Sequence, residues 1–251
     1  MNRRARHLLA ERGMRRLLFL LLIACPILAQ TPPPKPWSST FGAGVALTSG
    51  NTSTRNFNLA FATKYDPKTR ILFKAEALYL MGSTNGEKQV DKATANAREE
   101  LTLSNRTFAF GEVSYLRDPF KGISYLVAPI AGVGYRLLQS EKQTLSVDGA
   151  AGAIVESDEG IGRSTSGVLK AGENYDWTIS PVSKFTQKVS GLWKTKDFAD
   201  ALYHFDAGLS TTIATRAELK VAYTYDYKNR PPSPAIKKGD SALFAAILFK
   251  F

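Results

Sequence analysis

The residues with the most obvious potential for catalysis are His204 and Asp206, two positions apart near the end of an extended segment. Alternate residues of a β-strand point to the same face, so this imidazole and carboxylate share a face. Such a pair can support general-base chemistry. A hydrolase also needs a nucleophile or a second acid, and Ser190 and Asp226 on the adjacent segments carry no motif for either. We expect no enzyme, with a protease or phospholipase using His204 and Asp206 as the alternative.

Opposite charges two residues apart form a second group. The pairs are Lys74 with Glu76, Arg98 with Glu100, and Glu218 with Lys220. Each pair shares one strand face. An Arg or Lys near the middle of a lipid-facing surface costs about 2–4 kcal/mol, so we expect these faces to point into an interior. There they either pair across neighbouring strands, which we favour, or line a selective passage.

Neither a cofactor nor a metal site is predicted. Acidic residues occur between the extended segments, at Asp158, Glu159, Asp197 and Asp200. They lack the spaced oxygen ligands of a calcium-binding loop. The only cysteine, Cys25, lies in the N-terminal leader, so the remaining chain forms no disulfide and no thiolate metal site.

The first 29 residues have the order of a secretory signal peptide. Arginines precede an apolar run over 17–24, and small residues lead to Ala29. The run is too short for a membrane-spanning helix, which needs about 20 apolar residues. We expect a signal peptide over 1–29, cleaved after Ala29, and a proline-rich periplasmic tether over 30–37. Met14 is an alternative start, and acylation of Cys25 as in a lipoprotein is an alternative fate.

The leader also carries much of the positive charge. The whole chain has 33 Lys and Arg against 22 Asp and Glu, and the chain after the leader keeps 27 against 21. That modest surplus occurs without a basic cluster interleaved with stacking aromatic residues. We therefore expect no nucleic-acid partner.

From Trp37 onward the chain divides into segments of ten to fifteen residues, many with period-two alternation, separated by turn-forming residues. In the clearest, Leu219, Val221 and Tyr223 oppose Glu218 and Lys220. Twelve such segments lie at 38–49, 54–65, 70–82, 91–103, 107–117, 123–138, 143–156, 164–179, 184–196, 201–213, 216–228 and 240–251. The sequence predicts an all-β fold: a single antiparallel transmembrane β-barrel of outer-membrane type over 38–251, with about 12 strands.

The connections and the aromatic residues support this prediction. Short connections such as 66–69 and 214–215 alternate with longer ones such as 83–90, 157–163 and 229–239, as expected for periplasmic turns and outside loops. Aromatic residues fall toward both ends of the strands, as in two interfacial girdles. A soluble periplasmic β-domain that binds a ligand is the alternative, and it does not explain two girdles. The fifth, eighth and ninth segments fit poorly. In the fifth, Glu112 shares a face with Phe108 and Phe110.

Phe251 ends the chain at the tip of an amphipathic segment. By similarity to outer-membrane barrels, this terminal aromatic residue is an assembly signal read by periplasmic chaperones and the barrel-assembly machinery. Outer-membrane lipid is the other expected partner.

Three stretches resemble the YdiY-like, salt-induced outer-membrane protein family, whose function is not established. They are GVALTSGNTSTRN at 44–56, FAFGEVSYLRDPFKG at 108–122 and GVGYRLLQSEKQTLSVDG at 132–149. The resemblance implies an outer-membrane barrel and supplies no catalytic signature. We expect a narrow passive pore for small solutes or ions, or a structural envelope protein that responds to osmotic conditions.

Overall fold

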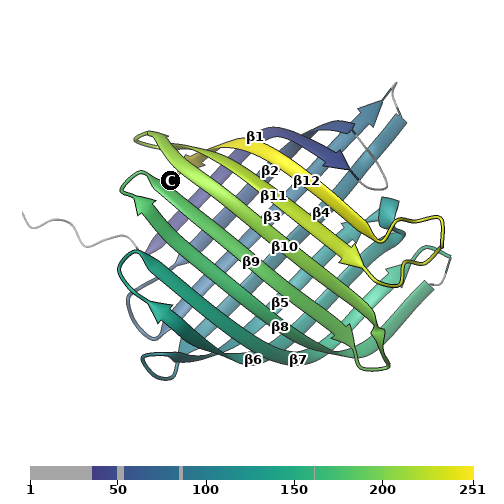
Figure 1. Ribbon diagram of the computed structural model, residues 1–251, viewed down its shortest axis with the longest axis horizontal. Helices are drawn as coiled ribbons and strands as arrows, with labels where there is room; N and C mark the ends of the chain where they lie inside the picture. Colours follow the sequence, from purple (N-terminus) through teal and green to yellow (C-terminus); the bar gives the residue numbers. More distant parts are fainter. Residues whose placement is uncertain (1–35, 50–53, 85–86, 161) are drawn as a thin grey trace, which may run out of the picture. The chain divides into compact units, whose positions relative to one another are not determined.

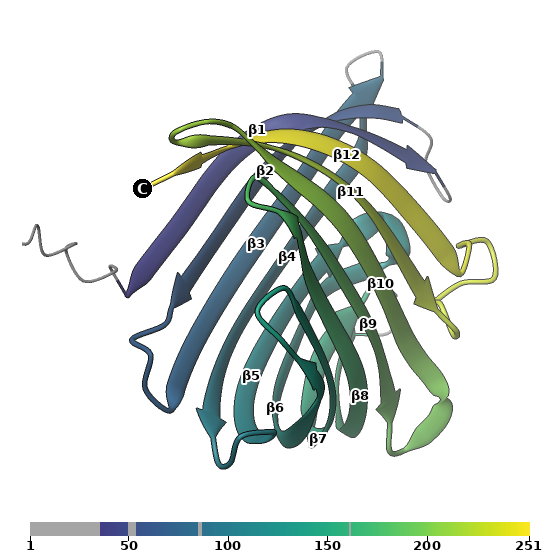
Figure 2. The same ribbon diagram turned by 60° about the vertical axis from the view of Figure 1, so that its left-hand side comes forward.

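The computed structural model describes residues 36–49, 54–84, 87–160 and 162–251, which form one closed antiparallel barrel of twelve strands (Figures 1 and 2). The expected signal peptide and most of the expected tether lie outside the described residues, and Trp37 is already the first residue of β1. The strands are β1 Trp37–Ser49, β2 Thr54–Tyr65, β3 Ile71–Thr84, β4 Glu87–Thr102, β5 Thr107–Asp118, β6 Ile123–Gln139, β7 Gln143–Asp158, β8 Gly162–Ser180, β9 Ser183–Lys194, β10 Asp197–Ala214, β11 Ala217–Lys228 and β12 Gly239–Lys250. The predicted fold and strand number are confirmed.

The sheet closes because the first strand pairs with the last. β1 and β12 run antiparallel from Thr40 opposite Lys250 to Ser49 opposite Ser241. Phe251 extends this seam, since its N–H donates to the Ser39 carbonyl at 3.1 Å. We call the end of the barrel near Phe251 the turn end, and the opposite end, with the 229–238 connection, the loop end. None of the described residues forms a helix long and apolar enough to cross a membrane.

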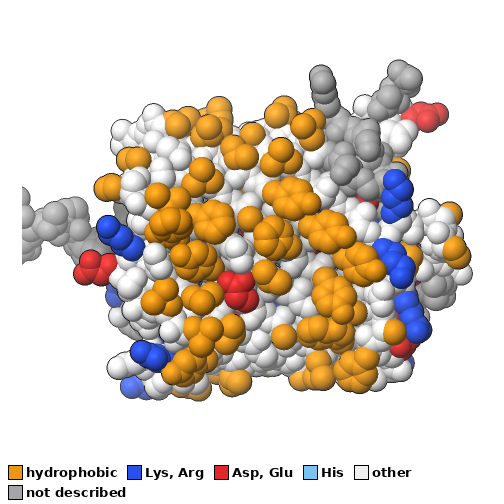
Figure 3. Space-filling view, viewed as in Figure 1, with side chains coloured by type: hydrophobic (Ala, Val, Ile, Leu, Met, Phe, Trp, Pro, Cys, Tyr) orange, Lys and Arg blue, Asp and Glu red, His pale blue; other side chains and the backbone are white. Residues whose placement is uncertain are grey.

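Period-two alternation separates an apolar outer surface from the barrel interior, which we call the lumen. On β11, Val221, Tyr223 and Tyr225 are exposed while Ala222 and Thr224 between them are buried. The same pattern on the other strands produces a broad apolar outer face (Figure 3). Large exposed apolar patches are rare on soluble monomers, so this surface is suited to lipid.

The outer face also carries acidic residues, at Glu99 on β4 and at Glu173 on β8. The pairing on β8 and β9 points Glu173 and Gln187 outward, and the Gln187 side-chain amide donates to Glu173 Oε2 at 3.2 Å. An acidic side chain is visible among apolar ones in Figure 3. Tyr175 follows on the same face, so the carboxylate lies beside the aromatic residues of the turn end.

Apolar side chains also fill part of the lumen, along β5 to β8. Phe108 and Phe110 point inward and pack with Ile130 and Ile154 in a buried cluster. A Cβ at Gly134 would overlap the Phe108 ring, so glycine on β6 makes room for this aromatic residue. The cluster explains why segment 107–117 alternates poorly: its inward face mixes phenylalanines with a charge.

Two of the predicted longer connections are mostly strand. β3 and β4 extend through Thr84 and from Glu87, and β7 and β8 extend through Asp158 and from Gly162. Beyond the lipid, both faces of a strand meet water, so polar residues there carry no alternation to detect. Only the 229–238 connection is as long as predicted, among those within the described residues.

The outer face generates a stability prediction. Val221 is 42% exposed and lies near the middle of β11, so Val221→Arg should lower the free energy of unfolding in lipid vesicles by about 2–4 kcal/mol. Thr215→Arg, in the exposed turn before β11, is the control and should change it little. Equal denaturant midpoints for the two variants would contradict a lipid-facing Val221.

Candidate functional site in the barrel lumen

Charged side chains of both signs line the lumen. The predicted residues on β3, β4 and β11 all occupy inward positions of the alternation: Lys74, Glu76, Arg98, Glu100, Glu218 and Lys220. Arg98 and Glu100 make the contact that their spacing suggests, with Nε and Oε1 3.0 Å apart. In the other two pairs, Lys74, Glu76 and Glu218 contact charged residues on other strands.

Arg98 is the centre of a buried ion cluster. Its guanidinium contacts Glu112 at 2.9 Å and Asp148 at 3.0 Å as well as Glu100. The guanidinium carbon lies 3.5 Å from the centroid of the Phe110 ring, a cation–π contact. Lys170 from β8 forms a second ion pair with Glu112. The cluster joins β4, β5, β7 and β8 along the filled side of the lumen.

Neighbouring strands supply the partners that the sequence did not identify. Lys74 contacts Glu100 on β4 at 3.5 Å, and Glu218 contacts Lys250 on β12 at 2.5 Å. Both contacts are diagonal, because Lys74 lies directly opposite Arg98 and Glu218 directly opposite Leu248. Diagonal neighbours on adjacent strands are within reach of long side chains.

Three further ion pairs join strands that are far apart around the barrel. Glu76 on β3 pairs with Lys188 on β9, half-way around the ring of strands. Lys92 on β4 pairs with Asp226 on β11. Lys228 on β11 contacts Asp158 on β7 at 2.7 Å. These side chains reach across the lumen and narrow it.

His204 bonds a different carboxylate from the predicted one. Its Nδ1 lies 2.8 Å from Asp226 Oδ1, whereas Asp206 is paired in register with Lys188. The register aligns Ser190, His204 and Asp226 in one row across β9, β10 and β11. A directly opposed strand neighbour is closer than a residue two positions along, which explains the change of partner.

The row has limited similarity to a hydrolase site. Asp226 is also held by Lys92, and its backbone carbonyl accepts a hydrogen bond from Lys121 at 3.0 Å. Within the described part of the chain, no hydrogen bond joins Ser190 to His204. Activation of a serine nucleophile needs such a contact.

Several residues of the network were not predicted from the sequence as lumen charges. They are Lys92, Glu112, Asp148, Lys170 and Lys188. Each is a charged residue at an inward position of its strand. Alternation was the available signal, but the partner of each depends on which strands face each other across the lumen.

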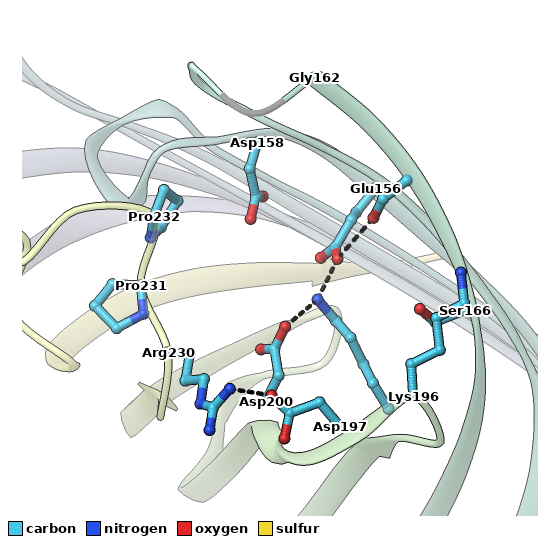
Figure 4. Close-up of a pocket in the computed structure, with 12 residues that line it drawn as sticks. Glu156, Asp158, Gly162, Ser166, Lys196, Asp197, Asp200, Arg230, Pro231 and Pro232 are labelled. Atoms are coloured by element: carbon cyan, nitrogen blue, oxygen red, sulfur yellow. Dashed lines mark hydrogen bonds and ion pairs between the residues drawn. The ribbon is translucent and has the colours of Figure 1, made fainter.

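A cavity of about 370 Å³ lies at the loop end, between the ends of β7 to β10 and the 229–238 connection (Figure 4). Asp158, Asp197 and Asp200 line it. These three belong to strand ends and not to the connections where we expected them. Among the described residues, no group of three or more His, Cys, Asp or Glu side chains is arranged to hold a metal ion.

The buried cluster predicts a large cost for losing its centre. Arg98→Gln should lower the free energy of unfolding by about 3–5 kcal/mol, because buried Asp148 then has no cation and Glu100 and Glu112 each lose one. The measurement is denaturant unfolding of refolded protein, with Arg216→Gln in an exposed turn as the control. A loss no larger than that of the control would show that Arg98 does not hold the cluster together.

Comparisons with known proteins identify the family. Residues 41–251 match the family model described as "Protein of unknown function, DUF481". The chain is 25% identical over 207 residues to the uncharacterized protein YdiY of Escherichia coli strain K12, covering 82% of this chain and 80% of that protein.

Among solved structures, the NanC porin has a TM-score of 0.56 at 10% identity, covering 84% of this chain and 100% of that one. The KdgM porin has a TM-score of 0.50 at 8% identity, covering 85% and 99%. These two likenesses concern the barrel fold. Since the family model spans most of its length, the chain belongs to the DUF481 family.

Proposed function

We propose that this protein is a narrow outer-membrane pore for small hydrophilic solutes or ions. The observation that carries the proposal is the exposure of inward-facing charges. In the Glu76–Lys188 pair the side chains are 51% and 39% exposed, although both lie inside the barrel. Charged groups half-exposed in the lumen require water-filled space around them. The Arg98 cluster, in contrast, is almost completely buried.

The contrast between these two regions supports a passage along one side of the lumen. The Phe108 cluster and Arg98 fill the side formed by β4 to β8. The Glu76–Lys188 pair bridges the remaining space between β3 and β9. An ion pair of this kind narrows the passage and gives it fixed charges of both signs. Rings or pairs of charged side chains set ion selectivity in other pores.

The barrel resemblance supports an outer-membrane location and a pore-like role. NanC and KdgM are porins that share the barrel fold with this chain. We place the turn end of the barrel toward the periplasm and the loop end toward the outside of the cell. For His204 we propose a structural role, because its Asp226 partner is already held by Lys92.

The pore proposal predicts opposite selectivity changes for the two members of the bridging pair. In planar bilayers, Glu76→Gln should shift the reversal potential toward the value expected for an anion-selective pore, since it leaves the charge of Lys188 without its carboxylate partner. Lys188→Gln should shift it toward cations. The pair is half-exposed, so either change should leave the barrel folded.

Lys142→Gln, in an exposed turn, is the control and should have a much smaller effect on selectivity. Reversal potentials unchanged in both lumen variants would contradict a passage at this pair. No conductance in any salt by the folded wild-type protein would favour a structural envelope role, with the ion pairs acting as a closed plug.

We also propose that Phe251 is an assembly signal. Its backbone completes the β1–β12 seam while its side chain is 77% exposed and free to be recognised. Phe251→Ala keeps the backbone contacts, so a fall in heat-modifiable membrane protein would be due to the aromatic ring. Pro234→Ala, in the exposed 229–238 connection, should leave the level near that of the wild type. Equal levels in both variants would contradict recognition of the ring.

A further inference from the structure

The loop-end cavity contains buried hydrogen-bond acceptors without donors. One oxygen of each of Glu156, Asp158 and Asp200 is buried and has no hydrogen-bond partner. Glu156 is only 3% exposed and Asp158 only 9%. All three side chains line the cavity, and Figure 4 shows them around its centre. A buried, unpaired carboxylate oxygen is costly unless a donor reaches it.

The cations near the cavity are already engaged. Lys194 serves both Glu156 and Asp200, with 2.6 Å to Asp200. Lys228 contacts Asp158 at 2.7 Å. The two remaining cations, Arg230 and Lys196, bond to the Asp197 carboxylate and the Thr165 carbonyl respectively.

This distribution leaves the cavity with an excess of acceptors. Glu156 and Asp200 share Lys194, and each keeps one carboxylate oxygen without a donor. An anionic ligand would meet buried carboxylates and cations that are already bonded. A ligand with several donors and no acceptor would satisfy these oxygens.

We propose that this cavity binds the primary ammonium group of a small organic amine. An ammonium has three N–H donors and no acceptor, and so matches the three free carboxylate oxygens in number. The cavity, at about 370 Å³, is within the size range of small-molecule sites. Pro231 and Pro232 on its wall offer apolar contact to a short aliphatic chain. The site lies apart from the Glu76–Lys188 pair, and binding of the amine does not depend on whether the barrel conducts ions.

The experiment is isothermal titration calorimetry on the full chain folded in detergent micelles. The probes are 1,4-diaminobutane, 1,4-butanediol and butyrate, titrated separately at constant ionic strength. We expect saturable one-site binding of the diamine and none of the diol or the acid, which have similar chains but lack the ammonium. Calcium ions serve as a fourth probe.

Two variants test the location of the site. Asp200→Asn removes one acceptor while Lys194 keeps Glu156 as its partner, and it should weaken diamine binding about tenfold through loss of a charge-assisted hydrogen bond. Asp158→Asn should act in the same direction, with heat-modifiable migration as a check that the barrel is folded. Asp176→Asn is the matched control, since Asp176 pairs with Lys184 at 2.7 Å near the turn end of β8.

Several results would overturn the proposal. They are the absence of diamine binding, equal binding of the diol, calcium bound more tightly than the diamine, or diamine affinity unchanged in both folded variants. Because calorimetry in micelles measures binding alone, failure of the pore in bilayers would leave this test unaffected.

Discussion

The pairing of β1 with β12 is the constraint on which the rest of the structure depends. Hydrocarbon offers no partner for a free backbone N–H or carbonyl, so a sheet can lie in lipid only when it has no open edge. The seam runs from Thr40 opposite Lys250 to Ser49 opposite Ser241 and is extended by Phe251. Once the sheet closes, each residue faces either lipid or a confined lumen.

Closure also accounts for the ion pairs. Charges excluded from the outer face are concentrated inside, where strands far apart in sequence come within reach of each other. The ion pairs differ in their exposure to water. The Arg98 cluster is almost completely buried, so its charges are stabilised by one another and not by water. The Glu76–Lys188 pair keeps contact with water, so it contributes little to stability and is available to set selectivity.

The fold could be predicted from the sequence because the outer and inner surfaces of a barrel require apolar and polar residues to alternate along each strand. Leu219 and Val221 against Glu218 and Lys220 indicate the outward and inward faces without any knowledge of neighbouring strands. No sequence pattern indicates which charged residues pair across the lumen. Glu76 and Lys188 are 112 residues apart, and their contact follows from the closed ring alone.

Local reasoning failed where strand neighbours compete. Spacing along one strand suggested Asp206 for His204, but the register places Asp226 directly opposite it. The strand extensions near Thr84 and Asp158 were missed for a related reason, since strands outside lipid need no apolar face. Segment 107–117 alternates poorly because its inward face carries both Phe108, in an apolar cluster that fills part of the lumen, and Glu112.

The most direct test of the closed barrel is a disulfide across its seam. Phe41 and Phe249 are direct partners on β1 and β12. In a Cys25→Ala background, Phe41→Cys with Phe249→Cys should form an intramolecular disulfide on refolding and oxidation, seen as a mobility shift without dimers. Phe41→Cys with Leu219→Cys joins positions two strands apart and in different rows of the register, more than about 10 Å apart and too far for a disulfide. Linkage of the first pair and not of the second is the expected result, and absence of an intramolecular link in the first pair would contradict closure.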